Sequence, residues 1–186
     1  MGTEVCRYTE TLNTCLFSKS FPPTIVECRG RPSPSDSAIR NVTSEMTAKP
    51  KYEVIEHTAD IGIRVQAPTL AELFANAAYG MFDLICNAES IRGEIERPIT
   101  VTANDPEELM VNWLGELLFM FETQKLLLSE FDITEIDNRH LQATVRGEEY
   151  SPDRHELDHG IKAVTYYGLE IGRENSNWTA AVVFDV

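Results

Sequence analysis

Residues 131–184 decide the fold class, because four strand-like stretches follow one another there with no helix between them: FDITEI (131–136), LQATVR (141–146), IKAVTYYGLEI (161–171) and WTAAVVF (178–184). Their apolar residues alternate with polar ones or form short runs, and Gly- and Asn-containing turns bound them, which is typical of strands. Strands that follow one another directly favour antiparallel pairing. This part of the chain therefore predicts a mainly antiparallel sheet.

Two helices lie upstream of that run, and each has a clear start signal. Thr69-Leu-Ala-Glu72 is a capping box, and apolar residues at helical spacing continue to about Cys86. The second helix has Asp105 as N-cap and Pro106 in its first position, and it continues to about Thr123. A wide apolar face that includes Trp113 favours a place in the core over a ligand site.

Three shorter strands complete the pattern, at 52–56, 61–65 and 95–101. The order is two strands, a helix, a strand, a helix and four strands. We therefore expect an α+β fold: a single two-layer domain in which two main helices pack on a mainly antiparallel sheet.

The charge divides the chain of 186 residues into two parts. Residues 1–49 hold five acidic and six basic residues, with several Pro, Ser and Thr and no sustained periodicity, so we expect a disordered N-terminal extension. Residues 50–186 hold 25 acidic and 10 basic residues and form the predicted domain. Met46 is an alternative start, because it leads directly into the first strand.

Composition excludes several classes of protein. No apolar run approaches the ~20 residues of a membrane span, and no signal segment opens the chain. The net charge of −14 disfavours direct nucleic-acid binding and favours a basic protein partner or a divalent metal. The four cysteines form no C-x-x-C pair, so we expect free thiols in a cytoplasmic protein.

One motif matches the zinc-protease pattern H-E-x-x-H: His155, Glu156 and His159 in the segment HELDH. The chemistry needs both histidines on one face of a stable helix. Pro152 upstream and Gly160 downstream leave about two turns at most, which is marginal for an isolated helix. A solvated loop between two strands is the favoured interpretation, and a metal-dependent hydrolase is the alternative.

Two carboxylate-bearing segments stand at strand ends. His57-Thr-Ala-Asp60 joins the first two strands, and Asp185 precedes Val186, whose α-carboxylate lies one residue away. Carboxylates this close repel one another unless a cation neutralises them, although a solvated terminus also removes the repulsion. From the residues alone both interpretations stay open. Glu148 and Glu149 are expected on a solvated face.

In order along the chain, several segments resemble the archease family. The resemblance runs from about Lys51 to Val186. Its segments are HTADIGI (57–63), TLAELF (69–74), LMVNWL (109–114), GE (147–148), IKAVTY (161–166) and FDV (184–186). One departure is Tyr167, where many members of the family carry His.

The resemblance implies a function. Archeases are protein cofactors of the RtcB-type RNA ligase, which joins RNA ends in tRNA splicing and RNA repair with GTP and manganese. They promote guanylylation of that ligase and its repeated turnover, and they catalyse no known reaction themselves. The family's metal site corresponds to Asp60, Asp185 and the carboxylate of Val186. Three oxygen ligand groups suit calcium best, with magnesium or manganese as further candidates.

Two classes of function are therefore carried forward. The first is an accessory activator whose metal-bearing acidic tip meets the ligase, with His57 and Lys162 as expected partner contacts. The second is a metal-dependent hydrolase that uses His57 with Asp60 and Asp185, or the HELDH segment. The poor helix signal around HELDH favours the activator.

Overall fold

A computed structural model of the chain describes residues 52–56 and 60–186. The predictions for residues 1–49, including the alternative start at Met46, lie outside these residues, and so does His57. The elements follow in this order: β1 (Tyr52–Glu56), β2 (Asp60–Ala67), α1 (Leu70–Ile85), the 3-10 helix η1 (Ala88–Ser90), β3 (Ile95–Thr102), α2 (Pro106–Gln124), β4 (Leu126–Ile136), β5 (His140–Glu149), β6 (Ala163–Glu174) and β7 (Asn177–Asp185).

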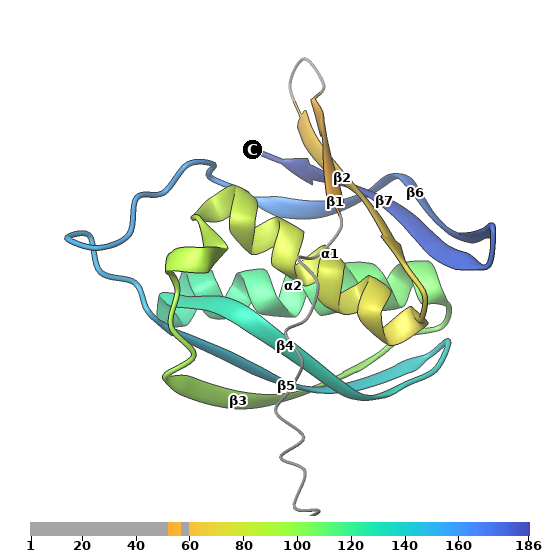
Figure 1. Cartoon of the computed structure of the whole chain (residues 1–186), viewed down its shortest axis with the longest axis horizontal. Helices are drawn as coiled ribbons and strands as arrows, with labels where there is room; N and C mark the ends of the chain where they lie inside the picture. The colour runs from red at the N-terminus through yellow and green to blue at the C-terminus, as the bar shows by residue number, and fades with distance from the viewer. Residues whose placement is uncertain (1–51, 57–59) are drawn as a thin grey trace, which may run out of the picture. The chain divides into compact units, whose positions relative to one another are not determined.

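The strands form two antiparallel sheets, and both helices lie between them (Figure 1). The four-stranded sheet has the order β1-β2-β7-β6, and the three-stranded sheet has the order β3-β5-β4. Helix α1 contacts β2 and β7 on one side and β4 on the other, while α2 contacts β6 and the three-stranded sheet. The α+β class, the two main helices and the antiparallel pairing are confirmed.

The division into two sheets follows from the burial of α1. Nine of its residues are buried, and they lie around most of the helix circumference: Leu73, Phe74, Ala77, Ala78, Gly80, Met81, Phe82, Leu84 and Ile85. A helix with so wide an apolar surface must be covered by other elements on two opposite sides. One sheet on each side of the helices provides that cover, whereas the sequence pattern suggested a single sheet.

Both helix starts are as predicted. The Thr69 hydroxyl accepts a hydrogen bond from the Glu72 N–H at 3.1 Å, and the Asp105 carboxylate accepts one from the Glu108 N–H at 2.7 Å. These caps satisfy amide groups that have no partner within the helix. Trp113 is fully buried, and its Nε1 donates to the Phe74 carbonyl at 3.1 Å. Its core role is confirmed, and the bond ties α2 to α1.

Strand β4 begins at Leu126, five residues before the predicted start at Phe131. Leu126, Leu127 and Leu128 are all buried, so this part of β4 lacks the alternation that marks a half-buried strand. A Cβ on Gly147 of β5 would overlap the Leu127 carbonyl oxygen and lie 2.7 Å from its carbon. The two strands therefore approach so closely at this point that only glycine fits.

Two further features bear on the class of protein. Within residues 52–56 and 60–186, no helix combines the length and apolar character required to cross a membrane. Cys86 is a buried free thiol, as predicted.

Candidate functional site

Strand register brings Asp60 and Asp185 together. Asp60 is the first residue of β2 and Asp185 the last of β7, and the two are directly paired in the antiparallel ladder. Directly opposed residues project their side chains to the same face of a sheet, with Cβ atoms about 5 Å apart. Two carboxylates that are 125 positions apart in sequence therefore share one edge of the four-stranded sheet.

These carboxylates lie on the sheet face that points away from the helices. Ile61, Ile63 and Val65 of β2 are buried toward α1, so Asp60 and Arg64 point to the opposite face. Asp60 is half-buried, whereas Asp185 is exposed. Among the described residues, neither side-chain carboxylate has a hydrogen-bond or ion-pair partner. Within the described part of the chain, the two carboxylates therefore face each other without a cation bonded to either.

Lys162 and Val186 complete this end of the sheet. The Lys162 N–H donates to the Asp185 carbonyl at 2.8 Å, and the Lys162 Nζ donates to the Val186 oxygen at 2.8 Å. Ala163, which follows Lys162, pairs with Asp185 in the β6–β7 ladder. We call Asp60, Lys162, Asp185 and Val186 the carboxylate tip. All three predicted metal ligands and one of the two predicted partner contacts thus lie at one place.

The side chains of the tip do not by themselves form a metal-binding group. Across residues 52–56 and 60–186, no three His, Cys, Asp or Glu side chains form a group that could hold a metal ion. Asp60 and Asp185 supply two such side chains, and the main-chain carboxylate of Val186 is the third anionic group at the tip. Carboxylate oxygens of this kind suit hard cations.

The HELDH segment does not form the alternative metal site. It lies in an irregular stretch with no helix, so His155 and His159 are not placed one turn apart. His155 is only 3% exposed, its Nδ1 accepts the Ser151 N–H at 3.0 Å, and its Nε2 lies 3.3 Å from Glu148 Oε1. Glu156 and His159 are exposed, as expected of a solvated loop. That expectation is wrong for His155, whose two ring nitrogens are both engaged.

Glu148 is a second residue that the sequence interpretation placed wrongly. It is 4% exposed instead of solvated, and it accepts two hydrogen bonds from the Arg154 guanidinium, at 2.7 and 2.9 Å. The Arg92 N–H donates a third at 2.7 Å. The hydrogen bonds from Arg154 lower the pKa of Glu148 from its ordinary value of 4.5 to about 2, although burial opposes the shift. We call Glu148, Arg154 and His155 the buried ion cluster.

The buried ion cluster fixes the connection between the two sheets. Residues 150–162 join β5 of one sheet to β6 of the other and end at Lys162. Arg154 and His155 hold the beginning of the connection on Glu148, and the Asp158 N–H donates to the Ile85 carbonyl at 2.9 Å. These hydrogen bonds therefore hold the loop in place ahead of Lys162, which lies at the carboxylate tip.

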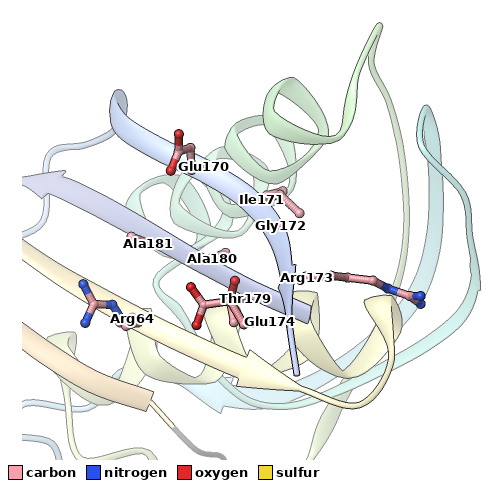
Figure 2. A pocket seen from close by; sticks show the side chains of 9 residues that line it. All are labelled: Arg64, Glu170, Ile171, Gly172, Arg173, Glu174, Thr179, Ala180 and Ala181. Carbon is pink, nitrogen blue, oxygen red and sulfur yellow. The ribbon is translucent and has the colours of Figure 1, made fainter. Parts of the chain in front are cut away.

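A shallow depression of about 610 Å³ lies on the same outer face of the four-stranded sheet. Figure 2 shows Arg64 of β2 and Glu170 of β6 well apart from each other at its rim, and the side chains of Glu174 of β6 and Thr179 of β7 close together. Its floor is formed by small side chains, and it is open to solvent. Asp60 of the tip and Arg64 of the depression lie on the same face of β2, because both alternate with its buried residues. The depression and the carboxylate tip therefore occupy two ends of one face of the sheet.

The comparison with protein families gives the class of protein. A model of the Archease protein family matches residues 52–186. The chain belongs to the archease family. The match begins at the first described strand and covers all ten elements of the fold.

Individual archeases agree with this assignment. The archease of Methanosarcina mazei is 41% identical over 140 residues, which cover 73% of this chain and 96% of that protein. The archease of Methanopyrus kandleri is 38% identical over 138 residues, covering 73% of this chain and 99% of that protein. The solution structure of protein 1598 of Methanobacterium thermoautotrophicum superimposes with a TM-score of 0.65 at 34% identity and covers 73% of this chain and 98% of its own.

Proposed function

We propose that this archease is a non-catalytic protein cofactor of an RtcB-type RNA ligase. In this proposal it promotes guanylylation of the ligase, supports its repeated turnover in tRNA splicing and RNA repair, and acts in the cytoplasm. Family membership supports the class of protein. The observation that carries the proposal is the carboxylate tip, where Asp60 and Asp185 are paired in register beside Lys162 and Val186.

A divalent cation fits the residues of the tip. Two carboxylates on directly opposed positions repel each other, and no described residue is bonded to either of them. Asp60, Asp185 and the α-carboxylate of Val186 would hold the cation, and calcium suits such oxygen ligands best, with magnesium or manganese as alternatives. A divalent cation held there would offset the negative charge of the three carboxylates.

The chain's own residues have distinct tasks at this tip. The β2–β7 ladder fixes the spacing of Asp60 and Asp185, because each is held in the backbone hydrogen bonding of its strand. Lys162 holds the Val186 oxygen, which limits fraying of the last residue. The excess of 25 acidic over 10 basic residues in 50–186 suits a partner surface of positive charge, such as a cleft that binds RNA.

A guanylylation assay tests the proposal. Purified ligase, GTP and metal are mixed with the full chain, and covalent guanylylation and multiple-turnover ligation are followed. Asp60→Asn and Asp185→Asn should each lower activation by at least about tenfold, because each removes one anionic ligand. Asp132→Asn is the matched control, since Asp132 is an exposed carboxylate on the three-stranded sheet, and it should activate like the unchanged chain.

Two results would contradict the proposal. One is full activation by both asparagine variants at the tip. The other is turnover of phosphoesters or peptides by the purified chain alone, because this would assign the chain to the metal-dependent hydrolases.

A further inference from the structure

Strand β6 contains an unusually large bulge just beyond the carboxylate tip. Its register with β7 changes from Thr165 opposite Val183 to Glu170 opposite Ala181. The four residues 166–169 therefore stand opposite the single residue Val182, whereas an ordinary bulge inserts one extra residue. Gly168 has a φ of +64°, a conformation that favours glycine and helps the backbone to accommodate the extra residues.

The bulge carries two adjacent exposed tyrosines. Tyr166 is 58% exposed and Tyr167 is 75% exposed. Tyrosine is enriched at protein interfaces, because it offers a large amphipathic surface and loses little conformational entropy when it is bound. We call residues 166–169 the tyrosine bulge.

The strand on each side of the tyrosine bulge is anchored. Before it, the Thr165 hydroxyl donates to the Val183 carbonyl at 2.9 Å. After it, the Ile171 N–H donates to Glu107 Oε1 of α2 at 3.4 Å. Because both ends are fixed, the two tyrosines are presented at a defined place on β6, an edge strand of the sheet. Presenting contacts on a fixed frame reduces the entropy lost on binding.

Carboxylates lie before and after the tyrosine bulge along the sheet. Asp185 pairs with Ala163, three residues before Tyr166, which corresponds to about 10 Å along a strand. Glu170 follows the bulge directly and lines the depression in Figure 2. The tyrosines therefore lie between the acidic tip and a further exposed carboxylate.

This combination suits arginine. A guanidinium group can stack on a tyrosine ring and can also pair with a carboxylate, so several arginines on one surface could use both kinds of group, and a guanidinium stacks better than the compact ammonium group of lysine. Nucleic-acid bases also stack on tyrosine, but the phosphates that accompany them would meet a domain with 25 acidic and 10 basic residues. A basic protein surface is therefore favoured over RNA.

We propose that the tyrosine bulge is a recognition site for arginine side chains on a partner protein, and that it docks the partner beside the carboxylate tip. The proposal deepens the proposed function and rests on it where the partner is taken to be the ligase.

The experiment uses the full chain and three variants. Tyr166→Ser combined with Tyr167→Ser removes both rings, and Tyr166→Phe combined with Tyr167→Phe keeps them. Phe119→Ser removes a ring that is 55% exposed on α2, outside the bulge. Binding to the ligase is measured by calorimetry, with the melting temperature and calcium binding of each variant as controls.

The double serine variant should bind the ligase at least about tenfold more weakly, which is the range expected for losing two desolvated cation–π contacts. The double phenylalanine variant and Phe119→Ser should stay within about threefold of the unchanged chain. Calcium binding should be the same in all four proteins. Ligase binding by the double serine variant at unchanged strength, or an equal loss in Phe119→Ser, would overturn the inference.

A second arm separates this inference from the proposed function. The full chain is titrated with a nonamer of arginine, a nonamer of lysine and a single-stranded RNA of matched length at one salt concentration. The arginine peptide should bind more tightly than the lysine peptide, and the double serine variant should lose that preference. If this holds while no ligase is bound, the proposed function fails and arginine recognition stands. Tighter binding of RNA than of the arginine peptide, lost in the double serine variant, would overturn arginine recognition.

Discussion

Replacing Glu148 by Gln removes the charge at the centre of the buried ion cluster and leaves its shape nearly unchanged. In the folded protein the pKa of Glu148 is lowered to about 2 from an ordinary value of 4.5, chiefly by hydrogen bonds from Arg154. A tenfold change in proton affinity corresponds to about 1.4 kcal/mol, so the charged form contributes about 3 kcal/mol to the free energy of unfolding at pH 7. Arg154 is 39% exposed and partly solvated, which lowers this value to about 2–3 kcal/mol.

The sign of the pH dependence follows from the same values. Because folding lowers the pKa of Glu148, its contribution is fully present above the unfolded value of 4.5 and is lost as the pH falls towards about 2. Once protonated, Glu148 resembles the glutamine that replaces it. The difference in unfolding free energy between the unchanged chain and Glu148→Gln should therefore shrink from about 2–3 kcal/mol at pH 7 to well under 1 kcal/mol at about pH 2, and it should vanish below that pH.

Urea denaturation at several pH values between these limits measures that difference directly. Glu149→Gln is the matched control, since Glu149 is the next carboxylate along β5 and is exposed. It should change the free energy of unfolding at pH 7 by much less than Glu148→Gln does. A constant difference for Glu148→Gln across the whole pH range would refute the assignment of its effect to the buried charge.

Three further predictions concern the strand contact, the tip and the partner. Gly147→Ala should lower the free energy of unfolding by about 3 kcal/mol in urea denaturation, because its Cβ would overlap backbone atoms of Leu127. The control Gly115→Ala should not destabilise the protein, because position 115 has open space around it. Equal effects of the two substitutions would contradict the close approach of the strands at Gly147. Lys162→Ala should lower ligase activation more than it lowers the melting temperature, since within the described part of the chain its Nζ bonds only the Val186 oxygen. A parallel loss of both would make Lys162 purely structural. The rate of association with the ligase, measured by stopped flow, should fall steeply between about 0.05 M and 0.3 M salt, while the dissociation rate changes little. An association rate that does not depend on salt would rule out electrostatic steering.

The helix starts could be predicted because their determinants are local. The caps of Thr69 and Asp105 bond amides three residues away, so the residue types at those spacings are sufficient. The α+β class followed in the same way from the order of helix-like and strand-like stretches. The division into two sheets did not, because it depends on which sides of α1 are covered, and an apolar pattern alone does not specify the partner of each side.

The candidate site was only partly accessible from sequence. Asp60 and Asp185 stood out separately, but their pairing depends on a ladder between strands at opposite ends of the domain. Glu148 and His155 were assigned to solvent because their environment comes from Arg92, which is 56 positions from Glu148, and from the fold of the loop. A glutamate followed six residues later by arginine and seven later by histidine was the one local signal for this cluster.

The tyrosine bulge was also invisible in the sequence. The stretch 161–171 reads as one continuous strand, and β6 spans nearly the same residues. The three extra residues become evident only when the register on β7 is compared before and after Val182. A register of this kind is set by pairing with a second strand, which the residues of the first do not reveal.

The central claim is that the carboxylate tip, including the α-carboxylate of Val186, binds a cation and activates the ligase. The most direct measurement adds Gly-Ser after Val186, which keeps every side chain but turns that carboxylate into a neutral peptide carbonyl. The same two residues added to the N-terminus form the control. Calcium binding and stimulated guanylylation should both fall by at least about tenfold in the C-terminally extended chain and stay unchanged in the control. If the C-terminally extended chain binds calcium and stimulates guanylylation like the unchanged chain, the tip is not the functional site.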